Sequence, residues 1–258
     1  MSTDYVSVTE IAGDEVTHEQ IERLCNRYYW AGNYCTGMDV VEAACGTGQG
    51  LGYLSKIAKT FEGADYSDEI LKIARRHYGN RIILKQFDAQ VMPYKDKSKD
   101  VILLFEAIYY LPDAEKFIKE CSRILRPGGK LLIATANKDL FDFNPSPYSY
   151  TYYGVIELKA LFHKHGFTTQ FWGDTPIDVL SIKQRILRPV KKIVISLGLM
   201  PKSMAGKKLL KRLVFGDLLK MPAEINDTTA RFVSPDALPS DKPCTTHKVI
   251  FCEATLVS

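Results

Sequence analysis

The 258-residue chain is 46% hydrophobic and 25% charged, with a formal net charge of +4, which fits one sizeable globular core and leaves little room for a second. No apolar run is long enough to span a membrane, and the start MSTDYVSVTE lacks the basic and apolar regions of a secretory signal. The six cysteines and five histidines show no metal-ligand spacing, so we expect reduced thiols and no metal site.

Helix-like and strand-like segments alternate along the first 140 residues. The spacing of apolar residues predicts helices over 18–31, 50–59, 67–79 and 113–129, the last ended by Pro127 and two glycines. Strand-like runs cover 39–44, 60–65, 81–88, 99–106 and 129–137, and two further strands are expected at 168–174 and 248–256. Such alternation predicts an α/β fold in which a doubly wound, mostly parallel sheet carries helices on both faces.

The stretch VVEAACGTGQG, residues 40–50, places three glycines at alternate positions directly after the first of these strands. In a doubly wound sheet, ligands bind at the carboxyl ends of the strands, and a glycine-rich turn lets the backbone approach a ligand closely. The helix that follows offers free N–H groups to the same ligand. The spacing is GxGxG and not the GxGxxG of dinucleotide-binding folds, so the turn alone leaves the ligand open.

Acidic residues follow the next strands at the same edge of the predicted sheet. Asp65 ends the second strand, where it can accept hydrogen bonds from the hydroxyls of a ribose, and Asp88 follows the third, where it can accept from an adenine amine. Glu106 follows the fourth strand in FEAIYYLPD, and RILRPGGKLLIAT comes next. This ordered series resembles the class I S-adenosylmethionine-dependent methyltransferases, in particular the small-molecule group that includes enzymes of ubiquinone and menaquinone biosynthesis.

The resemblance covers residues 20–173 and the C-terminal HKVIFCEATL, and it implies a Rossmann-like sheet of seven strands, the last of them antiparallel. It also implies S-adenosyl-L-methionine as the cofactor, without a metal. The implied cofactor-binding residues are Arg27, Glu42, Gly46, Gly48, Asp65, Tyr66, Asp88, Ala89 and Phe105. A helix face packed on the sheet is an equal alternative for Arg27, and Trp30 on the same helix is expected in the core.

Glu106 and Tyr109 are the candidate catalytic residues. A sulfonium methyl group is already electrophilic, so the protein has to align the reacting atoms and exclude water, and a hydroxyl acceptor also gains from a general base. Glu106 is the first polar residue after its strand, where the roles of base, acceptor ligand and support of the cofactor loop remain open. We expect some tyrosines of the aromatic segment 141–153 to line the acceptor pocket, because each combines an apolar face with a polar tip.

About seventy residues separate the last two expected strands, which is too many for a structureless loop in a compact domain. We therefore expect a methyltransferase core over 1–175 and 244–258, interrupted by a helical, basic insertion over 176–243 that forms a cap or lid. Within it, 183–220 carry eleven Lys or Arg and one acid on two expected amphipathic helices. Three roles stay open for this charge: binding an anionic acceptor, docking on an anionic membrane, or simple solvation.

Together these features predict an S-adenosylmethionine-dependent methyltransferase that acts on a small-molecule or lipid-linked acceptor, with a sugar or glycan hydroxyl as the candidate group. The alternatives are a C-methyltransferase of quinone-type biosynthesis and a non-catalytic cofactor-binding partner subunit. Nucleic acid is not favoured as a partner, because no RNA-binding module accompanies the basic segment. We expect a cytoplasmic protein, with peripheral membrane contact through 183–220 as an option, and the oligomeric state stays open.

Overall fold

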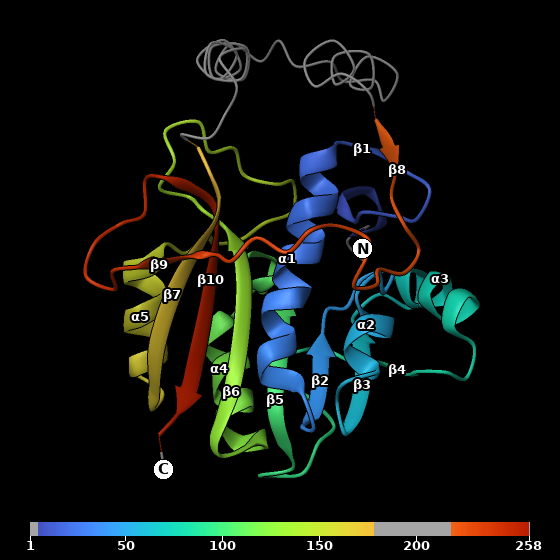
Figure 1. The fold of residues 1–258 in the computed structure, drawn as a ribbon. Helices are drawn as coiled ribbons and strands as arrows, with labels where there is room; N and C mark the ends of the chain where they lie inside the picture. The colour runs from blue at the N-terminus through green and yellow to red at the C-terminus, as the bar shows by residue number, and fades with distance from the viewer. Residues whose placement is uncertain (1–4, 178–217, 258) are drawn as a thin grey trace.

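The computed structural model describes residues 5–177 and 218–257 (Figure 1). The described helices are α1 (His18–Cys35), α2 (Leu51–Ser55), α3 (Asp68–Tyr78), α4 (Ala114–Ile124) and α5 (Val155–His163), with short 3₁₀ turns at Tyr5–Val8 and Ile108–Tyr110. The strands are β1 (Glu15–Val16), β2 (Asp39–Ala43), β3 (Thr60–Asp65), β4 (Ile83–Gln86), β5 (Lys99–Phe105), β6 (Leu125–Ala136), β7 (Phe167–Pro176), β8 (Leu219–Lys220), β9 (Asp236–Leu238) and β10 (His247–Leu256).

The central sheet has the order β4-β3-β2-β5-β6-β10-β7-β9. The strands from β4 to β6 run parallel, whereas β10 is antiparallel to both of its neighbours and β9 is antiparallel to β7. The order reverses between β2 and β5, which is the switch point where such sheets bind ligands. The mostly parallel α/β fold is therefore confirmed, but the predicted count of seven strands is wrong. The sheet has eight strands, because β9 forms an additional edge strand. Its three residues are too few to show a periodic pattern in the sequence.

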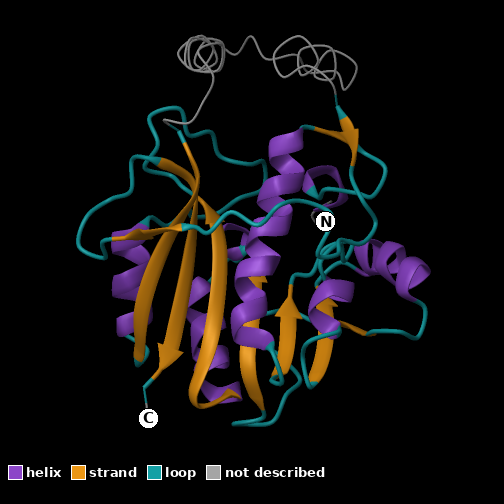
Figure 2. Cartoon of the chain, viewed as in Figure 1, coloured by secondary structure: helices purple, strands orange, loops and turns teal. Residues whose placement is uncertain are grey.

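Helices cover both faces of the sheet, as predicted (Figure 2). One buried cluster joins α1, α2 and α3 to one face through side chains such as Leu24, Leu54 and Leu71. A second cluster joins α4 and α5 to the other face through Phe117 and Phe162. Because successive strand residues point to opposite faces, the central strands β2, β5, β6 and β10 each contribute buried residues to both clusters.

Two element boundaries differ from the prediction near the fourth helix. The helix expected over 113–129 ends at Ile124, and β6 already begins at Leu125. Leu125 lies opposite Lys99 of β5 in the ladder, so strand pairing takes over from the helix two residues before Pro127. Pro127 disfavours a helical conformation at Arg126, the residue before it, and pairing with β5 ends the helix still earlier, at Ile124.

α1 crosses the sheet and carries part of the core. Thr17 and Gln20 form a capping box at its start, with each side chain accepting from the other residue's backbone N–H. Trp30 is 3% exposed and packs its ring against Phe251, with the ring centroids 4.9 Å apart, which confirms its expected place in the core. Over 5–177 and 218–257, no helix is long and apolar enough to cross a membrane.

The predicted basic insertion lies largely outside the described residues. Both expected amphipathic helices fall in the stretch 178–217, so their existence and the division into core and insertion stay predictions. The described part of the predicted insertion, residues 218–243, contacts the core, where Met221 and Ile225 are buried in the same cluster as residues of α1. Tyr29 of α1 also donates a hydrogen bond to the carbonyl of Asn226, and β8 pairs with β1.

Candidate functional site

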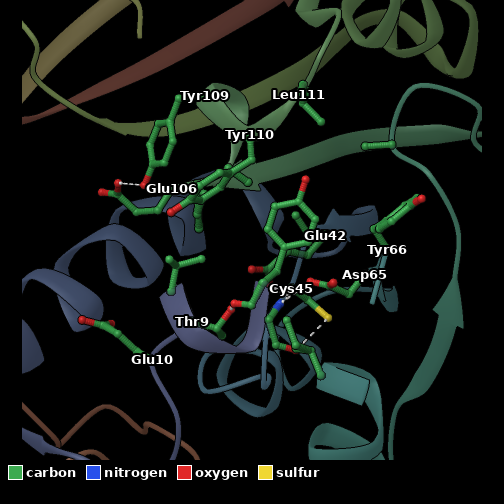
Figure 3. A pocket seen from close by; sticks show the side chains of 18 of the residues that line it. Thr9, Glu10, Glu42, Cys45, Asp65, Tyr66, Glu106, Tyr109, Tyr110 and Leu111 are labelled. Carbon is green, nitrogen blue, oxygen red and sulfur yellow. Dashed lines mark hydrogen bonds between the residues drawn. The ribbon is translucent and has the colours of Figure 1, made fainter. Parts of the chain in front are cut away.

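A cavity of about 520 Å³ opens at the carboxyl ends of the strands on either side of the switch point (Figure 3). Its walls include all the residues that the sequence predicted for the site except Gly48. They are Arg27, Glu42, Gly46, Asp65, Tyr66, Asp88, Ala89, Phe105, Glu106 and Tyr109. Figure 3 shows Asp65 and Tyr66 on one side of the cavity, Glu106 and Tyr109 on the other, and Glu42 between them. Parallel strands explain the convergence, because their carboxyl ends meet at one edge.

The glycine loop joins β2 to α2 and forms the floor of one side. Gly46 has a φ of 60° and borders the cavity, where its N–H donates to Asp65 Oδ2 at 2.9 Å. Gly48 has a φ of 90° and lies behind the wall, because its carbonyl accepts from the Tyr78 hydroxyl at 2.6 Å. An added Cβ at Gly48 would come within 3.0 Å of the Leu51 and Tyr78 side chains. Gly48 therefore shapes the turn without bordering the cavity.

The carboxylate of Asp65 is held by two backbone hydrogen bonds. Its Oδ1 accepts from the Ser67 N–H at 2.9 Å, in addition to the Gly46 N–H on Oδ2. Burial raises the pKa of Asp65, and these backbone N–H groups act in the opposite direction by stabilising the carboxylate. Tyr66, the next residue, stands 60% exposed at the rim. The carboxylate is thus fixed in orientation, and carboxylate oxygens can accept further hydrogen bonds from a ligand.

Glu42, Tyr28 and Arg27 form a buried group at the centre of the cavity. The Tyr28 hydroxyl donates to Glu42 Oε1 at 2.6 Å. Burial raises the pKa of Glu42 to about 8, although the Tyr28 hydrogen bond and the charge of Arg27 oppose the shift. Glu42 Oε2 and Arg27 Nε are both buried without a hydrogen-bond partner. Glu42 Oε2 can therefore accept a hydrogen bond from a ligand, and Arg27 Nε can donate one to it.

Asp88 and Ala89 follow β4 at the far side of the loop. Asp88 Oδ1 accepts from the backbone N–H of Gln90 at 2.8 Å and from its side-chain Nε2 at 3.1 Å. Gln90 Oε1 in turn accepts from the Asp113 N–H at 3.0 Å, so the start of α4 holds the glutamine that orients Asp88. The sequence prediction missed Gln90, which also lines the cavity.

Glu106 and Tyr109 form a hydrogen-bonded pair on the opposite side. Glu106 directly follows β5 with a φ of 50°, a conformation that costs energy in a residue other than glycine and that is frequent at functional sites. The Tyr109 hydroxyl donates to Glu106 Oε2 at 3.0 Å, while Glu106 Oε1 is buried without a partner. Burial and the neighbouring carboxylate raise the pKa of Tyr109 well above its usual value, so its hydroxyl keeps its proton.

The aromatic loop after β6 supplies the wall next to this pair. Tyr150 and Ser146 border the cavity, which agrees with the expectation that some tyrosines of this loop do so. The Tyr150 N–H donates to the Tyr109 carbonyl at 2.7 Å. Tyr152 stacks on the Tyr109 ring with the centroids 4.3 Å apart, and its hydroxyl accepts from the Ser146 N–H. Loop and catalytic candidates are therefore one packed unit.

A segment over residues 5–10, here called the cover, borders the cavity through Tyr5, Val8, Thr9 and Glu10, and no sequence pattern predicted it. The carbonyl of Glu10 accepts from Thr47 Oγ1 at 3.0 Å and from Gln49 Nε2 at 2.8 Å, so the cover is attached to the glycine loop. Tyr5 places its ring edge-on against Tyr110, with the centroids 5.7 Å apart. The segment is short and mixed in polarity, which is why periodicity could not detect it.

Comparison with known proteins supports, for the central part of the chain, the methyltransferase family that the sequence motifs resemble. Residues 41–133 match the family described as "Methyltransferase domain". A probable S-adenosylmethionine-dependent methyltransferase of Mycolicibacterium smegmatis is 32% identical over 158 residues, which are 59% of this chain and 58% of that protein. A fatty-acid O-methyltransferase of the same organism is 38% identical over 103 residues, 39% of this chain and 38% of that protein.

Among solved structures, a possible histamine N-methyltransferase of Thermotoga maritima superposes with a TM-score of 0.57 at 17% identity. The match covers 92% of this chain and 91% of that one, and at this identity it shows a shared fold. The chain spans about half the length of the curated relatives it matches.

Proposed function

We propose that this chain, whose residues 41–133 match a methyltransferase domain family, is a class I S-adenosylmethionine-dependent methyltransferase that transfers the methyl group of this cofactor to a hydroxyl group of a small or lipid-linked acceptor. One observation carries the proposal. A single cavity holds a buried Glu42 and Arg27 with unpartnered polar atoms at its centre, and across from Asp65 it holds Glu106 with an unpartnered carboxylate oxygen.

The residues around the cavity fit the cofactor. Its methionine end carries an ammonium and a carboxylate, which match the unpartnered Glu42 Oε2 and Arg27 Nε. Asp65 would accept from the ribose hydroxyls, and Asp88 with the Ala89 N–H would hold the adenine. Tyr66, Phe105 and the Gly46 backbone would complete the enclosure, while Gly48 holds the shape of the loop. When bound, S-adenosylmethionine supplies an electrophilic methyl group on a sulfonium.

Glu106 is proposed as the general base. Its free Oε1 can take the proton from an acceptor hydroxyl, and Tyr109 holds the other carboxylate oxygen in place through its hydrogen bond. Residues of the cover over 5–10 and of the aromatic loop line this region of the cavity, where they can shield a bound acceptor from water. Exclusion of water and fixed orientation are the two contributions that methyl transfer needs most from a protein.

Two features support a hydroxyl acceptor with an apolar part. An ionised Glu106 attracts a hydrogen-bond donor and repels a carboxylate, so a hydroxyl suits the position better than a carboxylic acid. Phe141, Tyr148 and Tyr150 remain 51%, 53% and 59% exposed, so the aromatic loop that borders the cavity through Tyr150 also exposes apolar surface. A sugar or glycan hydroxyl stays a candidate within this class, since sugar rings also pack on tyrosine faces.

The test combines binding and turnover. Calorimetry with S-adenosylhomocysteine should show binding to the purified full chain. Labelled S-adenosylmethionine offered with lysate fractions, split into lipid, nucleotide-sugar and polymer pools, should then label one pool. Binding without labelling in any pool would favour the non-catalytic partner subunit, and absence of binding would refute the cofactor site itself. A labelled product that releases no labelled methyl iodide in hot hydriodic acid, which cleaves methyl ethers and esters but not carbon-bound methyl groups, would favour the C-methyltransferase alternative.

A further inference from the structure

Arg23, on α1, borders the cavity without a strong partner. Its Nε is buried and makes no hydrogen bond, although its side chain as a whole is 29% exposed. Within the described ranges, the only carboxylate oxygen found within 4 Å of it is Glu19 Oε1, at 3.9 Å. Both oxygens of Glu19 accept from Lys248 Nζ, at 2.7 and 2.6 Å, so Glu19 is committed elsewhere. The Arg23 charge is therefore poorly compensated by the protein.

The other nearby acid is committed as well. Asp174 accepts from Asn26 Nδ2 at 2.9 Å and from Thr175 Oγ1 at 3.0 Å. The charge of Arg23 is one of the effects that oppose the burial-driven rise in the pKa of Asp174, but the two side chains form no ion pair. A buried guanidinium nitrogen without a partner is costly, which points to a ligand that completes it.

Arg27, one helical turn further along α1, also has a buried Nε without a hydrogen-bond partner, but it lies among acidic groups. Burial disfavours its charge, yet nearby Tyr28 and the acids Glu106, Glu10 and Glu42 raise its pKa. Acidic groups thus surround Arg27, whereas Arg23 has none at hydrogen-bond distance. The two arginines differ in electrostatic environment although they lie on the same face of one helix.

The position of Arg23 separates it from the cofactor residues. In Figure 1, the N-terminal end of α1 rises beyond the carboxyl ends of β2 and β3, and Arg23 precedes Arg27 by one turn of this helix. Four helical residues correspond to about 6 Å along the axis. The proposed cofactor contacts Glu42 and Asp65 lie at the strand ends below. Arg23 therefore borders the cavity from a position nearer the start of α1 than Arg27, which leaves it available to an acceptor.

We propose that Arg23 binds an anionic group of the methyl acceptor, a carboxylate, phosphate or sulfate. This inference rests on the proposed function, and it adds a second recognition element to it. The acceptor then carries a hydroxyl that meets Glu106 and an anion that meets Arg23. Repulsion by Glu106 keeps the anionic group away from the reacting position, so the two charges orient the acceptor in one direction only.

A binding experiment tests the site without turnover. The Arg23 Nε–H signal of the full chain, loaded with S-adenosylhomocysteine, is identified by its loss in Arg23→Gln and followed by NMR. Titration with inorganic phosphate, acetate and chloride should give a saturable shift for phosphate or acetate and none for chloride. The stronger of the two anions identifies the acceptor chemistry. Lack of any saturable shift, or an equal shift at the exposed Arg76 of α3, would overturn the proposal.

An activity experiment tests the same site through the acceptor. Labelled S-adenosylmethionine is offered with a metabolite extract divided by anion exchange into anionic and remaining fractions. Wild type should label the anionic fraction. Arg23→Gln should lower that rate at least about tenfold at limiting extract, the loss expected for one hydrogen bond to a charged group. Arg23→Lys should recover part of the rate, and Arg76→Gln should match wild type.

Three outcomes separate this inference from the proposed function. Labelling of only the neutral or cationic fractions would overturn the role of Arg23. Loss of S-adenosylhomocysteine affinity in Arg23→Gln beyond about twofold would reassign the residue to the cofactor carboxylate. If wild type binds S-adenosylhomocysteine but labels no fraction, the proposed function fails, and the NMR titration still decides whether Arg23 is an anion site.

Discussion

The Tyr28 hydroxyl donates a 2.6 Å hydrogen bond to Glu42 Oε1 at the centre of the cavity, and both residues are buried. Tyr28 comes from α1 and Glu42 from β2, so this contact joins the helix that carries both arginines to the strand that leads into the glycine loop. The Tyr28 ring also meets Phe105 of β5 edge-on, with the centroids 5.4 Å apart. One tyrosine thus links three elements at the switch point.

The first prediction concerns Glu42 and pH in the unliganded protein. Burial raises the pKa of Glu42 from an ordinary 4.5 to about 8, so the folded state favours its protonated form. The resulting stabilisation is fully present below pH 4.5 and is lost as pH rises through about 8. The free energy of unfolding of wild type should therefore fall relative to Glu42→Gln between pH 5 and 9, as measured by urea unfolding at several pH values. Parallel pH profiles of the two proteins would contradict it.

A second prediction follows for binding. If the ligand's ammonium meets Glu42, the ionised carboxylate is favoured in the complex, and binding near pH 7 must release a proton. Calorimetry with S-adenosylhomocysteine in buffers of different ionisation enthalpy should detect this release in wild type. Glu42→Gln should show a smaller release and weaker binding. Proton uptake, or the same release in both proteins, would place the ammonium elsewhere.

The third prediction concerns Asp65. In Asp65→Asn, an amide group replaces an oxygen that now accepts from the N–H of Gly46 or of Ser67, so a donor faces a donor. The affinity for S-adenosylhomocysteine should fall at least about tenfold by calorimetry, the usual loss for a hydrogen bond with a charged partner. Asp68→Asn is the matched control, because Asp68 lies on the exposed side of α3 in ion pairs with Lys72 and Arg75. Equal affinities of the two variants would refute the ribose assignment, and NAD should bind to neither.

The fourth prediction separates catalysis from binding at Glu106. Glu106→Gln keeps the size of the side chain but removes the base, so turnover should fall about 100-fold or more while the affinity for S-adenosylhomocysteine stays within twofold. Tyr109→Phe should lower turnover less, since it only frees the carboxylate from its hydrogen bond. Full activity of Glu106→Gln would remove the base from the mechanism, and lost cofactor affinity would assign Glu106 to support of the loop.

The fifth prediction concerns stability. Trp30→Ala should lower the free energy of unfolding by about 3–5 kcal/mol, because a large buried aromatic side chain leaves a cavity between α1 and the sheet. Phe232→Ala is the comparison, because Phe232 is 41% exposed and only meets the edge of Tyr29. Urea unfolding of both variants should separate them clearly, and similar losses would show that α1 does not contribute to the core as the contacts indicate.

Most of the site could be predicted because its residues lie at the carboxyl ends of neighbouring parallel strands. Glu42, Asp65, Asp88 and Glu106 lie in or directly after consecutive strands, and parallel strands end at one edge, so finding the strands located the residues. Trp30 was predictable for the same reason, since helical periodicity marks a buried face.

The missed features depend on contacts between distant segments. β9 has three residues and exists only because Phe171 and its neighbours in β7 offer a free edge. The cover over 5–10 is held by Thr47 and Gln49, and nothing in its own composition indicates a partner. From the sequence, Arg23 is an ordinary helical arginine with Glu19 four residues before it as a possible partner. Only the structure shows that both oxygens of Glu19 accept from Lys248 instead. No local pattern in the sequence encodes any of these pairings.

The place of β10 in the sheet has a consequence for biosynthesis. β10 lies between β6 and β7 and pairs with both, although the ribosome makes it long after either of them. Until residue 256 emerges, the facing edges of β6 and β7 have no strand between them. Unpaired edges of this kind recruit other chains. During synthesis there is therefore a period in which the parallel strands can already pair while the edges of β6 and β7 that face β10 are open to other chains. We expect chaperones to cover these edges until β10 pairs with both strands.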